Sequence, residues 1–598
     1  GNNLSPDASF DWFDYVVVHD EDKEHICNEG RIVMGERFDQ KTIYTFNHNL
    51  PNITSNKALS LYYRAASTAS SSSQLTLKIN GNISSTTYFE PYVPNYDCFK
   101  DGGMNIGSLN TLNPEVELSF IYNKPTSSSS AWLDYYELHC SRKLIFSEGF
   151  MPFQNMQSAN AKIAEYRLSN LPSSYQVFDV SDPVNVKIQN VFSDNGQWVF
   201  RNQTEGQVKR FVLNDGNTLS PKFEGVISNQ NLHGTGIVQF IIVSPQEFLD
   251  AANKLADFHR NRDNLATLVV TPQQIYNEFS SGSQDISAIR DFFKHVYYSN
   301  TNPVNQLRYA MLMGDASFDY KDKIPNNTNF IPTYESEPNW DINFSYFCSD
   351  DFYGFLDPMD GQWAGNQKLE IPVNRLPVAS AAEAMSMVDK IINYKSAASF
   401  GDWKNFVTLC ADDADAGWEK DFVYDFEDIY GNIDTTFKNL NVRKVYIDAY
   451  RQQNLGGSQR YPEAQEAIKK EFEKGTLIFN YIGHGGEEYL ATEKVIDIPL
   501  INSLKNINNL TVFFTATCEF SRYDDGKRKS AGEFVITNPN GGAIAMFTTV
   551  RVVYAYANTL LTKYFWSDCA FTKIGGRWPT LGEVYKKLKN RPDQSEND

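Results

Sequence analysis

The sequence has few basic residues for its size and few cysteines. Lysine and arginine number 54 against 73 aspartates and glutamates, which gives a formal net charge of −19. This balance argues against nucleic acid or an anionic membrane as a partner. The seven cysteines form no C-x-x-C pair, so neither a zinc ribbon nor a redox dithiol is indicated. Because no run of 18 apolar residues occurs, no transmembrane helix is predicted.

Several hydrolase motifs are also missing. The chain has no Gly-X-Ser-X-Gly, so a serine hydrolase with a nucleophile elbow is not indicated. It has no His-Glu-X-X-His, which excludes a zincin. A glycosidase needs two carboxyl groups facing each other across a cleft, which a sequence does not show. What remains is a chain of 598 residues, 41% hydrophobic and 14% aromatic, which suits two to four domains with sizeable cores.

Residues 1–235 are predicted to form a β-rich N-terminal region. Apolar and polar residues alternate over 59–63, 75–79 and 116–120, as in strands with one buried face. Asn80-Gly81 follows the second of these segments and is a strong hairpin signal. We expect a β-sandwich, divided into two β units near residues 145–165. Such a region could be a scaffold or a jelly-roll carbohydrate-binding module, since its aromatic residues suit either.

From about residue 236 the sequence alternates between apolar strand segments and helical patterns. Capping signals, in which a Ser or Thr is followed three residues later by Glu or Gln, predict helix starts at Ser244, Thr271, Ser380 and Ser530. This alternation predicts an α/β region with two mainly parallel sheets. We divide it into subdomain A at 236–401 and a catalytic subdomain B at 402–598.

Two short apolar segments of subdomain B are each followed by a residue that could act in catalysis. Residues 477–482 lead into His484 in a glycine-rich turn, and residues 511–515 lead into Cys518, which lies 34 positions after the histidine. This spacing leaves room for one helical crossover, so the two strands should be parallel neighbours. Sites in open α/β sheets form where the carboxyl ends of such strands meet. We therefore expect His484 and Cys518 to lie side by side.

These two residue types are the ones that cysteine catalysis needs. A free thiol is mostly protonated at neutral pH. A neighbouring imidazole can take its proton and later protonate a leaving amine. The backbone N–H groups of Gly485 and Cys518 are the predicted oxyanion donors. The alternative interpretation is that Cys518 is a buried core cysteine and His484 an ordinary turn residue. One observation argues against it: His484 is the only histidine after His295, and it lies in a glycine-rich turn after a strand.

The strand-His-Gly and strand-Cys segments, in this order and spacing, resemble the gingipain family of cysteine peptidases, and within it the sortases of the type IX secretion system. Similar segments occur along most of the chain, at 177–183 (VFDVSDP), 313–319 (MGDASFD), 349–354 (SDDFYG), 373–377 (VNRLP), 541–545 (GGAIA) and 548–553 (TTVRVV). The resemblance implies a caspase-like catalytic fold with a His–Cys dyad and no required cofactor.

The resemblance also implies roles for three further residues. In gingipains an acidic residue at a strand end before the histidine strand orients the histidine, and Asp412 matches this position, with Asp413 one residue away. An aspartate at a strand end could instead cap a helix. Asp421 and Tyr554 match the acid and the aromatic wall of the substrate pocket in arginine-specific gingipains. A solvated helix surface is the alternative for Asp421.

Calcium is a further implication, because gingipain relatives bind it. The irregular stretch 315–372 offers carboxylates, and we take as candidate ligands Asp315, Asp319, Asp350 and Asp351. Hard cations bind clustered carboxylates, but the spacing is not that of an EF-hand loop. Solvated or turn-capping aspartates are the alternative interpretation.

The function implied by the resemblance is sorting of secreted proteins. The relatives remove the C-terminal signal domain of cargo proteins and transfer the acyl group to an amine of surface lipopolysaccharide. This implies an exported protein, associated with the outer membrane at the surface of a Gram-negative cell of the Bacteroidetes, with other secretion proteins as partners. Although the first residues hold no leader peptide, we expect the natural chain to be longer. The alternatives are a general gingipain-like surface protease and a non-catalytic surface binding protein with the same fold.

Overall fold

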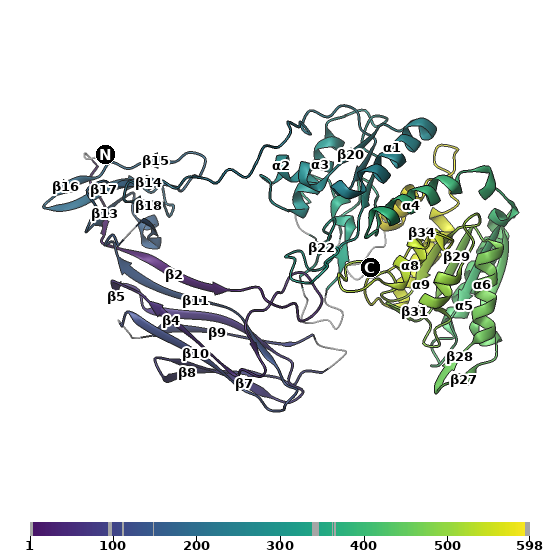
Figure 1. Ribbon diagram of the computed structural model, residues 1–598, viewed down its shortest axis with the longest axis horizontal. Helices are drawn as coiled ribbons and strands as arrows, with labels where there is room; N and C mark the ends of the chain where they lie inside the picture. Colours follow the sequence, from purple (N-terminus) through teal and green to yellow (C-terminus); the bar gives the residue numbers. More distant parts are fainter. Residues whose placement is uncertain are drawn as a thin grey trace. The chain divides into compact units, whose positions relative to one another are not determined.

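The computed structural model describes residues 4–93, 98–109, 113–147, 149–337, 346–360, 363 and 366–591. Contacts divide the chain into two units, of which the first comprises Gly1–Cys27 and Ile32–Ile227, and the second Asn28–Arg31 and Ser228–Asp598. In Figure 1 the first unit is coloured purple to blue, and most of the second teal through green to yellow. Within the described ranges, no helix is both long and apolar enough to cross a bilayer.

The first unit is built from β-strands, as the sequence predicted. Its largest sheet has the order β15-β14-β18-β12-β2-β11-β6-β9, with β3 and β5 also paired to β11, and two four-stranded sheets have the orders β4-β10-β7-β8 and β1-β13-β17-β16. The elements are β1 (Ala8–Phe10), β2 (Trp12–Asp20), β3 (Arg37–Phe38), β4 (Ile43–Asn49), β5 (Ile53–Thr54), β6 (Leu59–Ser67), β7 (Ser73–Ile79), β8 (Asn82–Phe89), β9 (Lys100–Leu109), β10 (Glu115–Asn123), β11 (Ala131–Lys143), β12 (Phe150–Gln154), η1 (Met156–Asn160), β13 (Ile163–Leu168), β14 (Gln176–Asp179), β15 (Lys187–Ile188), β16 (Phe192–Asp194), β17 (Gln197–Gln203) and β18 (Arg210–Asn214).

The two larger hydrophobic clusters of this unit join strands that are distant in sequence. One joins β4, β7 and β10 to β6 and β11 and includes Leu61 and Phe120. The other gathers Phe13, Phe153 and further residues from both ends of the region. Burial alternates along most of β10, which explains how a polar-apolar pattern produces one core-facing surface. Residues 80 and 81 join β7 to β8 with φ values of 48° and 80°, as the predicted hairpin turn requires.

The second unit contains two parallel sheets. The first has the order β20-β19-β21-β24, and the second has the order β26-β25-β29-β33-β34. The elements of the first, with those around it, are β19 (Phe240–Val243), η2 (Gln246–Phe248), α1 (Leu249–Asp263), β20 (Thr267–Val270), α2 (Pro272–Phe279), α3 (Ile286–Tyr298), β21 (Tyr309–Met313), η3 (Asp350–Gly354), β24 (Val373–Leu376) and α4 (Ala381–Tyr394). A separate antiparallel pair is formed by β22 (Tyr334–Glu335) and β23 (Cys348–Ser349). The predicted α/β region with mainly parallel sheets is therefore confirmed.

The second sheet carries the residues singled out above. Its elements, with the short ones around it, are η4 (Ala397–Ser399), η5 (Asp402–Asn405), β25 (Phe406–Ala411), α5 (Asp421–Thr436), β26 (Asn441–Tyr446), η6 (Ile447–Ala449), β27 (Gln453–Leu455), β28 (Ser458–Arg460), α6 (Pro462–Lys474), β29 (Ile478–Ile482), β30 (Gly485–Gly486), β31 (Tyr489–Leu490), β32 (Ile496–Asp497), α7 (Ile498–Ser503), β33 (Thr511–Ala516), α8 (Ala531–Thr537), β34 (Ala543–Phe547), α9 (Ala555–Tyr564), η7 (Phe565–Cys569, a π-helical turn) and α10 (Leu581–Lys589).

Helices cover both faces of the second sheet. Along β33, Phe513 faces a cluster with α6, α7 and α8, whereas Phe514 faces a cluster with α5, α9 and α10. The first of these clusters also includes Phe240 of the other sheet, so it joins the two sheets of the second unit into one core. Strands buried on both faces need continuous apolar sequence, which is what 477–482 and 511–515 provide.

Three of the four predicted helix caps are observed. Thr271 and Ser530 form capping boxes with Gln274 and Glu533, and the Ser380 hydroxyl accepts a hydrogen bond from the Glu383 N–H. The prediction for Ser244 is wrong. There the chain enters η2 with Pro245 at the N-cap and no side-chain cap, and the Ser244 hydroxyl donates to the Pro245 carbonyl at 3.2 Å instead.

Candidate active site

The ends of three neighbouring strands bring the candidate residues to one edge of the second sheet. In the parallel register, Ala411 of β25 lies opposite Ile482 of β29, which lies opposite Ala516 of β33. Asp412 directly follows the first of these strands. His484 and Cys518 each lie two residues beyond the paired positions of the other two. Since neighbouring strands are about 4.8 Å apart, the two side chains belong to adjacent loops of the same edge, as expected.

The turn before His484 requires glycine. Gly483 has φ of 150°, and a Cβ there would lie 2.3 Å from the Asp412 Cβ. Any side chain would therefore push the β25 and β29 ends apart. Gly485 is similarly confined, since a Cβ would lie 2.3 Å from the Thr517 Oγ1 in the cysteine loop. The glycines thus let the histidine and cysteine loops approach closely.

The imidazole of His484 is held by a carboxylate that the sequence did not indicate. Nε2 lies 2.7 Å from Oε1 of Glu419, and the side chain of Glu419 is only 7% exposed. Burial by itself would raise the pKa of Glu419, but hydrogen bonds from the Ala416 N–H and from His484 outweigh burial and lower it. The ring also lies edge-on to Trp418 and Phe422, at centroid distances of 5.9 and 5.8 Å. The contact with Glu419 therefore fixes Nε2 and, with the two aromatic rings, the orientation of the imidazole.

Asp412 reaches the backbone of His484 and not its ring. Its Oδ2 accepts the His484 backbone N–H at 2.8 Å, and its Oδ1 accepts the Asp413 N–H at 3.1 Å. Burial raises the pKa of Asp412 well above its usual range. The expected location at the sheet edge agrees with the structure, but the expected contact with the imidazole is made by Glu419. The physical reason is that the segment after β25 folds back, so a residue seven positions later faces the ring.

Cys518, the candidate nucleophile, differs in exposure from the other free cysteines of the described chain. It is the free cysteine that is partly exposed, whereas the free cysteines 140, 348, 410 and 569 are buried. Burial raises its pKa, although its Sγ also lies 3.7 Å from the Val553 carbonyl oxygen, which it contacts as a donor. The next residue, Glu519, has φ of 51°, a left-handed conformation that is rare outside glycine. Such conformations persist where the surrounding structure enforces them, often at active sites.

The predicted substrate residues flank these loops. Asp421 is the exposed first residue of α5, two positions after Glu419. Tyr554 is the N-cap of α9, is 49% exposed, and follows the residue whose carbonyl contacts Cys518. Both are therefore close in the chain to residues of the site, and their contacts with a substrate stay predictions, as does the oxyanion role of the Gly485 and Cys518 N–H groups.

The four candidate calcium ligands have separate protein partners in the structure. Asp350 forms a bidentate pair with Arg375, with two N–O distances of 2.7 Å, and Asp351 contacts Tyr585 and Lys589. Asp319 accepts the Ile324 N–H at 2.5 Å. Burial raises the pKa of the remaining member, Asp315, to about 7. These groups are held by different partners, and calcium binding by them stays a prediction.

Other groups of acids do lie close together in the described part of the chain. The ligand atoms of Asp412, Asp413 and Glu493 all lie within 4.8 Å of one another, next to the histidine loop. Burial is the largest cause that raises the pKa of Glu493 to about 7, and Asp413 adds to it. The pKa values of all three carboxyl groups are raised, with burial as the largest cause, which favours their protonated forms.

The parallel sheet, the adjacent His484 and Cys518 loops and the carboxylate on the imidazole define a cysteine peptidase of the caspase-like type. Comparison with known proteins agrees. Residues 234–597, more than half of the chain, match the family model of Peptidase family C25, and the chain belongs to this family. A search of curated proteins returned no significant match.

Among solved structures, the chain is similar to dimeric latent PorU from Porphyromonas gingivalis, with 25% identity and a TM-score of 0.59 over 67% of this chain. This chain covers 40% of that PorU chain. It also matches a complex of the pro- and mature domains of RgpB from Porphyromonas gingivalis (17% identity, 58% of this chain and 73% of that chain, TM-score 0.43). A third match is the Arg-specific cysteine proteinase gingipain R (18% identity, 62% and 77%, TM-score 0.44). The predicted resemblance to the gingipain family, and to PorU within it, is confirmed.

Proposed function

We propose that this chain is a sortase-like member of family C25. It would cleave the C-terminal signal domain from secreted cargo proteins and transfer the new carboxyl end to an amine of lipopolysaccharide. The observation that carries the proposal is the placement of His484 and Cys518 on adjacent loops of one sheet edge, with Glu419 on the imidazole. The similarity to PorU, a member of the type IX secretion sortases that the sequence motifs resemble, supports the choice of a sortase over a digestive peptidase.

Acylation of the enzyme begins with the protonated thiol. As the Sγ of Cys518 attacks the scissile carbonyl carbon, His484 accepts the thiol proton and becomes an imidazolium, which Glu419 stabilises. The carbonyl oxygen becomes an oxyanion, for which the N–H groups of Gly485 and Cys518 are the donors. The intermediate then collapses. The C–N bond breaks, the imidazolium protonates the departing amine of the signal domain, and a thioester between the cargo and Cys518 remains.

Deacylation reverses the roles with a new nucleophile. An acceptor amine attacks the thioester carbon and gives a proton to His484, a new amide bond forms, and the C–S bond breaks. The leaving thiolate takes back the proton from the imidazolium. Water in place of the amine would give hydrolysis, so the identity of the acceptor distinguishes a sortase from a general surface protease.

Substrate contacts and location complete the proposal. Tyr554 and Asp421 are the candidate side chains for the residues that flank the scissile bond. The enzyme would work at the outer surface of a Gram-negative cell together with other secretion proteins, and structural calcium is an accessory expectation that the reaction itself does not use. A non-catalytic binding role is disfavoured, because such a protein has no need of the Glu419–His484 pair or of a partly exposed thiol.

Product analysis tests the reaction type. Cargo carrying a C-terminal signal domain is incubated with the protein, with and without an amine acceptor, and the products are identified by mass spectrometry. We expect slow cleavage without acceptor and an amide-linked product with it. Rapid cleavage of unrelated arginine or lysine peptides, unaffected by acceptor, would instead identify a general protease and make Asp421 a candidate specificity residue.

Variants test the assigned residues in the same assay. His484→Ala and Cys518→Ala should each abolish processing, and the double variant should be no worse, because the two groups act as one unit. Glu419→Gln should lower kcat by roughly tenfold or more, since it removes the charge that stabilises the imidazolium. The matched control is Glu427→Gln, at an exposed position of α5, which should leave kcat unchanged. Asp412→Asn should cost less than loss of either dyad residue.

A further inference from the structure

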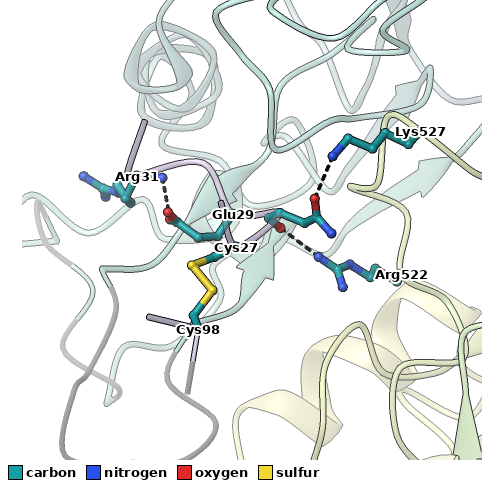
Figure 2. Close-up of a disulfide and its surroundings, with 7 residues drawn as sticks. Cys27, Glu29, Arg31, Cys98, Arg522 and Lys527 are labelled. Atoms are coloured by element: carbon teal, nitrogen blue, oxygen red, sulfur yellow. Dashed lines mark hydrogen bonds between the residues drawn. A yellow bond between two sulfur atoms is a disulfide. The ribbon is translucent and has the colours of Figure 1, made fainter. Parts of the chain in front are cut away.

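A four-residue segment from the N-terminal part of the chain belongs to the catalytic unit. Contacts assign Asn28–Arg31, here called the strap, to the second unit, although the residues before and after it belong to the first. The strap directly follows Cys27, which forms a disulfide with Cys98 (Figure 2). One end of the strap is therefore fixed covalently.

Two basic side chains from the loop after Cys518 bind the strap. Nη2 of Arg522 donates to the backbone carbonyl of Asn28 at 2.7 Å, and Nζ of Lys527 donates to its side-chain oxygen at 2.9 Å. Figure 2 shows both side chains reaching the strap from the same side. At the other end of the strap, Nε of Arg31 donates to the Glu335 carbonyl at 2.8 Å. The strap is thus bound along its length.

The strap is also closely packed. A Cβ on Gly30 would lie 2.7 Å from the Glu335 Cγ and 3.0 Å from the Phe318 carbonyl oxygen. Glu29 is 2% exposed, and its carboxylate accepts the Arg31 backbone N–H at 2.7 Å. A larger residue at position 30 cannot be accommodated unless the strap moves away from the body of the unit.

Arg522 connects the strap to both catalytic loops. It lies four residues after Cys518, and its Nη1 donates at 2.9 Å to Glu487, which lies three residues after His484. Its side chain is 7% exposed, so its donors depend on these protein partners and not on water. One planar guanidinium therefore spans the cysteine loop, the histidine loop and the strap, a role that suits arginine because its donors have fixed geometry.

We propose that the strap positions the catalytic dyad through Arg522. The Asn28 carbonyl fixes the guanidinium, and the guanidinium sets the spacing between the loops that carry His484 and Cys518. Arg522 and the strap are positioning elements that do not touch the substrate. The inference rests on the proposed cysteine peptidase reaction, and it adds that a segment nearly 500 positions away in the sequence is required for full activity.

Displacing the strap is the first test. Gly30→Val should lower kcat by about tenfold to a hundredfold, because small misplacements of reacting groups are costly, and should leave KM within about twofold. The matched control is Gly236→Val, at an exposed glycine of the same unit with nothing within 4 Å of an added Cβ, which should keep kcat. A folded Gly30→Val protein with wild-type kcat would overturn the proposal.

Changing the guanidinium is the second test and covers the case in which Gly30→Val does not fold. Arg522→Lys keeps the charge but cannot serve Glu487 and the Asn28 carbonyl together, so kcat should fall by about tenfold or more. Its matched control is Arg528→Lys. Arg528 also pairs with Glu487, is 52% exposed, and should tolerate the change with little loss. If both lysine variants lose activity equally, the pairing with Glu487 explains the effect and the strap does not.

A readout without substrate separates this inference from the proposed function. The rate at which iodoacetamide alkylates Cys518, at one fixed pH and with thermal unfolding measured in parallel, should change in Gly30→Val and Arg522→Lys and not in the controls. If the wild-type protein cleaves no peptide but these rates change as expected, the proposed function fails and the positioning role stands. Unchanged alkylation and unchanged kcat would reject the positioning role alone.

Discussion

At the scale of single residues, two similar acids near His484 have different hydrogen-bond partners and opposite pKa shifts. Asp412 and Glu419 are both buried acids near His484, but Asp412 accepts backbone N–H groups while Glu419 accepts the ring. Burial raises the pKa of the first, whereas the hydrogen bonds of the second outweigh burial and lower it. Glu419 is therefore the acid whose charged form is favoured next to the His484 ring.

The raised pKa of Cys518 gives a prediction for its reactivity. Alkylation requires the thiolate, and because burial raises the pKa, the thiolate should form only as pH rises above neutral. We expect the alkylation rate of the native protein to keep rising above pH ~8, near the ordinary thiol value. Labelling should be confined to Cys518, since burial raises the pKa of Cys140 and Cys569 to about 11.

Iodoacetamide labelling with peptide mapping across a pH series measures this. Unfolded protein is the control, because there every free thiol should react. A rate that is already constant below pH 7 would show a preformed thiolate–imidazolium pair and contradict the protonated resting state. Labelling of other cysteines before Cys518 would contradict its assignment as nucleophile.

At the scale of elements, the sequence predicts the order of the main strands and helices. The candidate site residues lie in the connections between them, which are harder to predict. The predicted strands that lead to His484 and Cys518 are β29 and β33, and the crossover between them contains α7. It also contains β30, β31 and β32, which form a small antiparallel sheet. Strands of two residues have too little periodicity to be found in a sequence.

A buried lysine joins two of these elements and provides a stability prediction. Nζ of Lys390 on α4 donates to the carbonyls of Ile536, Asn538 and Gly541 at 2.8, 3.1 and 2.6 Å, and so ties α4 to the turn before β34. Lys390→Met would leave three buried acceptors without this donor and should lower the free energy of unfolding by about 2–4 kcal/mol.

Thermal unfolding followed by circular dichroism measures the effect. Lys395→Met, an exposed position just past the end of the same helix, is the matched control and should change little. Burial lowers the pKa of Lys390 to about 7. Equal or greater stability of Lys390→Met would show that the cost of burying the amine exceeds the value of its hydrogen bonds.

At the scale of the whole molecule, the chain passes from the first unit to the second and back within its first 32 residues. The Cys27–Cys98 disulfide lies at this crossing and joins residues separated by 71 positions. A cross-link of this length lowers the entropy of the unfolded chain, which the loop-closure model values at roughly 4 kcal/mol, with measured values commonly 2–4. This bond therefore contributes much of the stability of the first unit.

Removing the disulfide should expose that contribution. The double variant Cys27→Ala/Cys98→Ala should unfold at a lower temperature than the wild type, by an amount corresponding to about 2–4 kcal/mol. Reductant should lower the midpoint of the wild-type protein and leave that of the double variant unchanged, which is the internal control. Equal midpoints for all four samples would show that the bond does not form or does not stabilise.

The sequence by itself determined the class of each region and where the two candidate catalytic residues lie. Alternation with a period of two indicated the β-rich unit, and continuous apolar segments followed by His484 and Cys518 indicated buried parallel strands. Strand direction then placed both residues at one sheet edge. Such inferences are possible because periodicity and strand order depend on residues that are close together in the sequence.

Only the tertiary structure decided which side chains support the dyad. Glu419 reaches His484 because a loop folds back, and Asn28 reaches Arg522 across 494 positions of sequence. The four aspartates proposed for calcium likewise have partners that the sequence did not indicate, since nearness in sequence does not determine where a loop directs each carboxylate. Contacts of this kind depend on how loops pack on a finished core, and no repeating pattern in the sequence marks them.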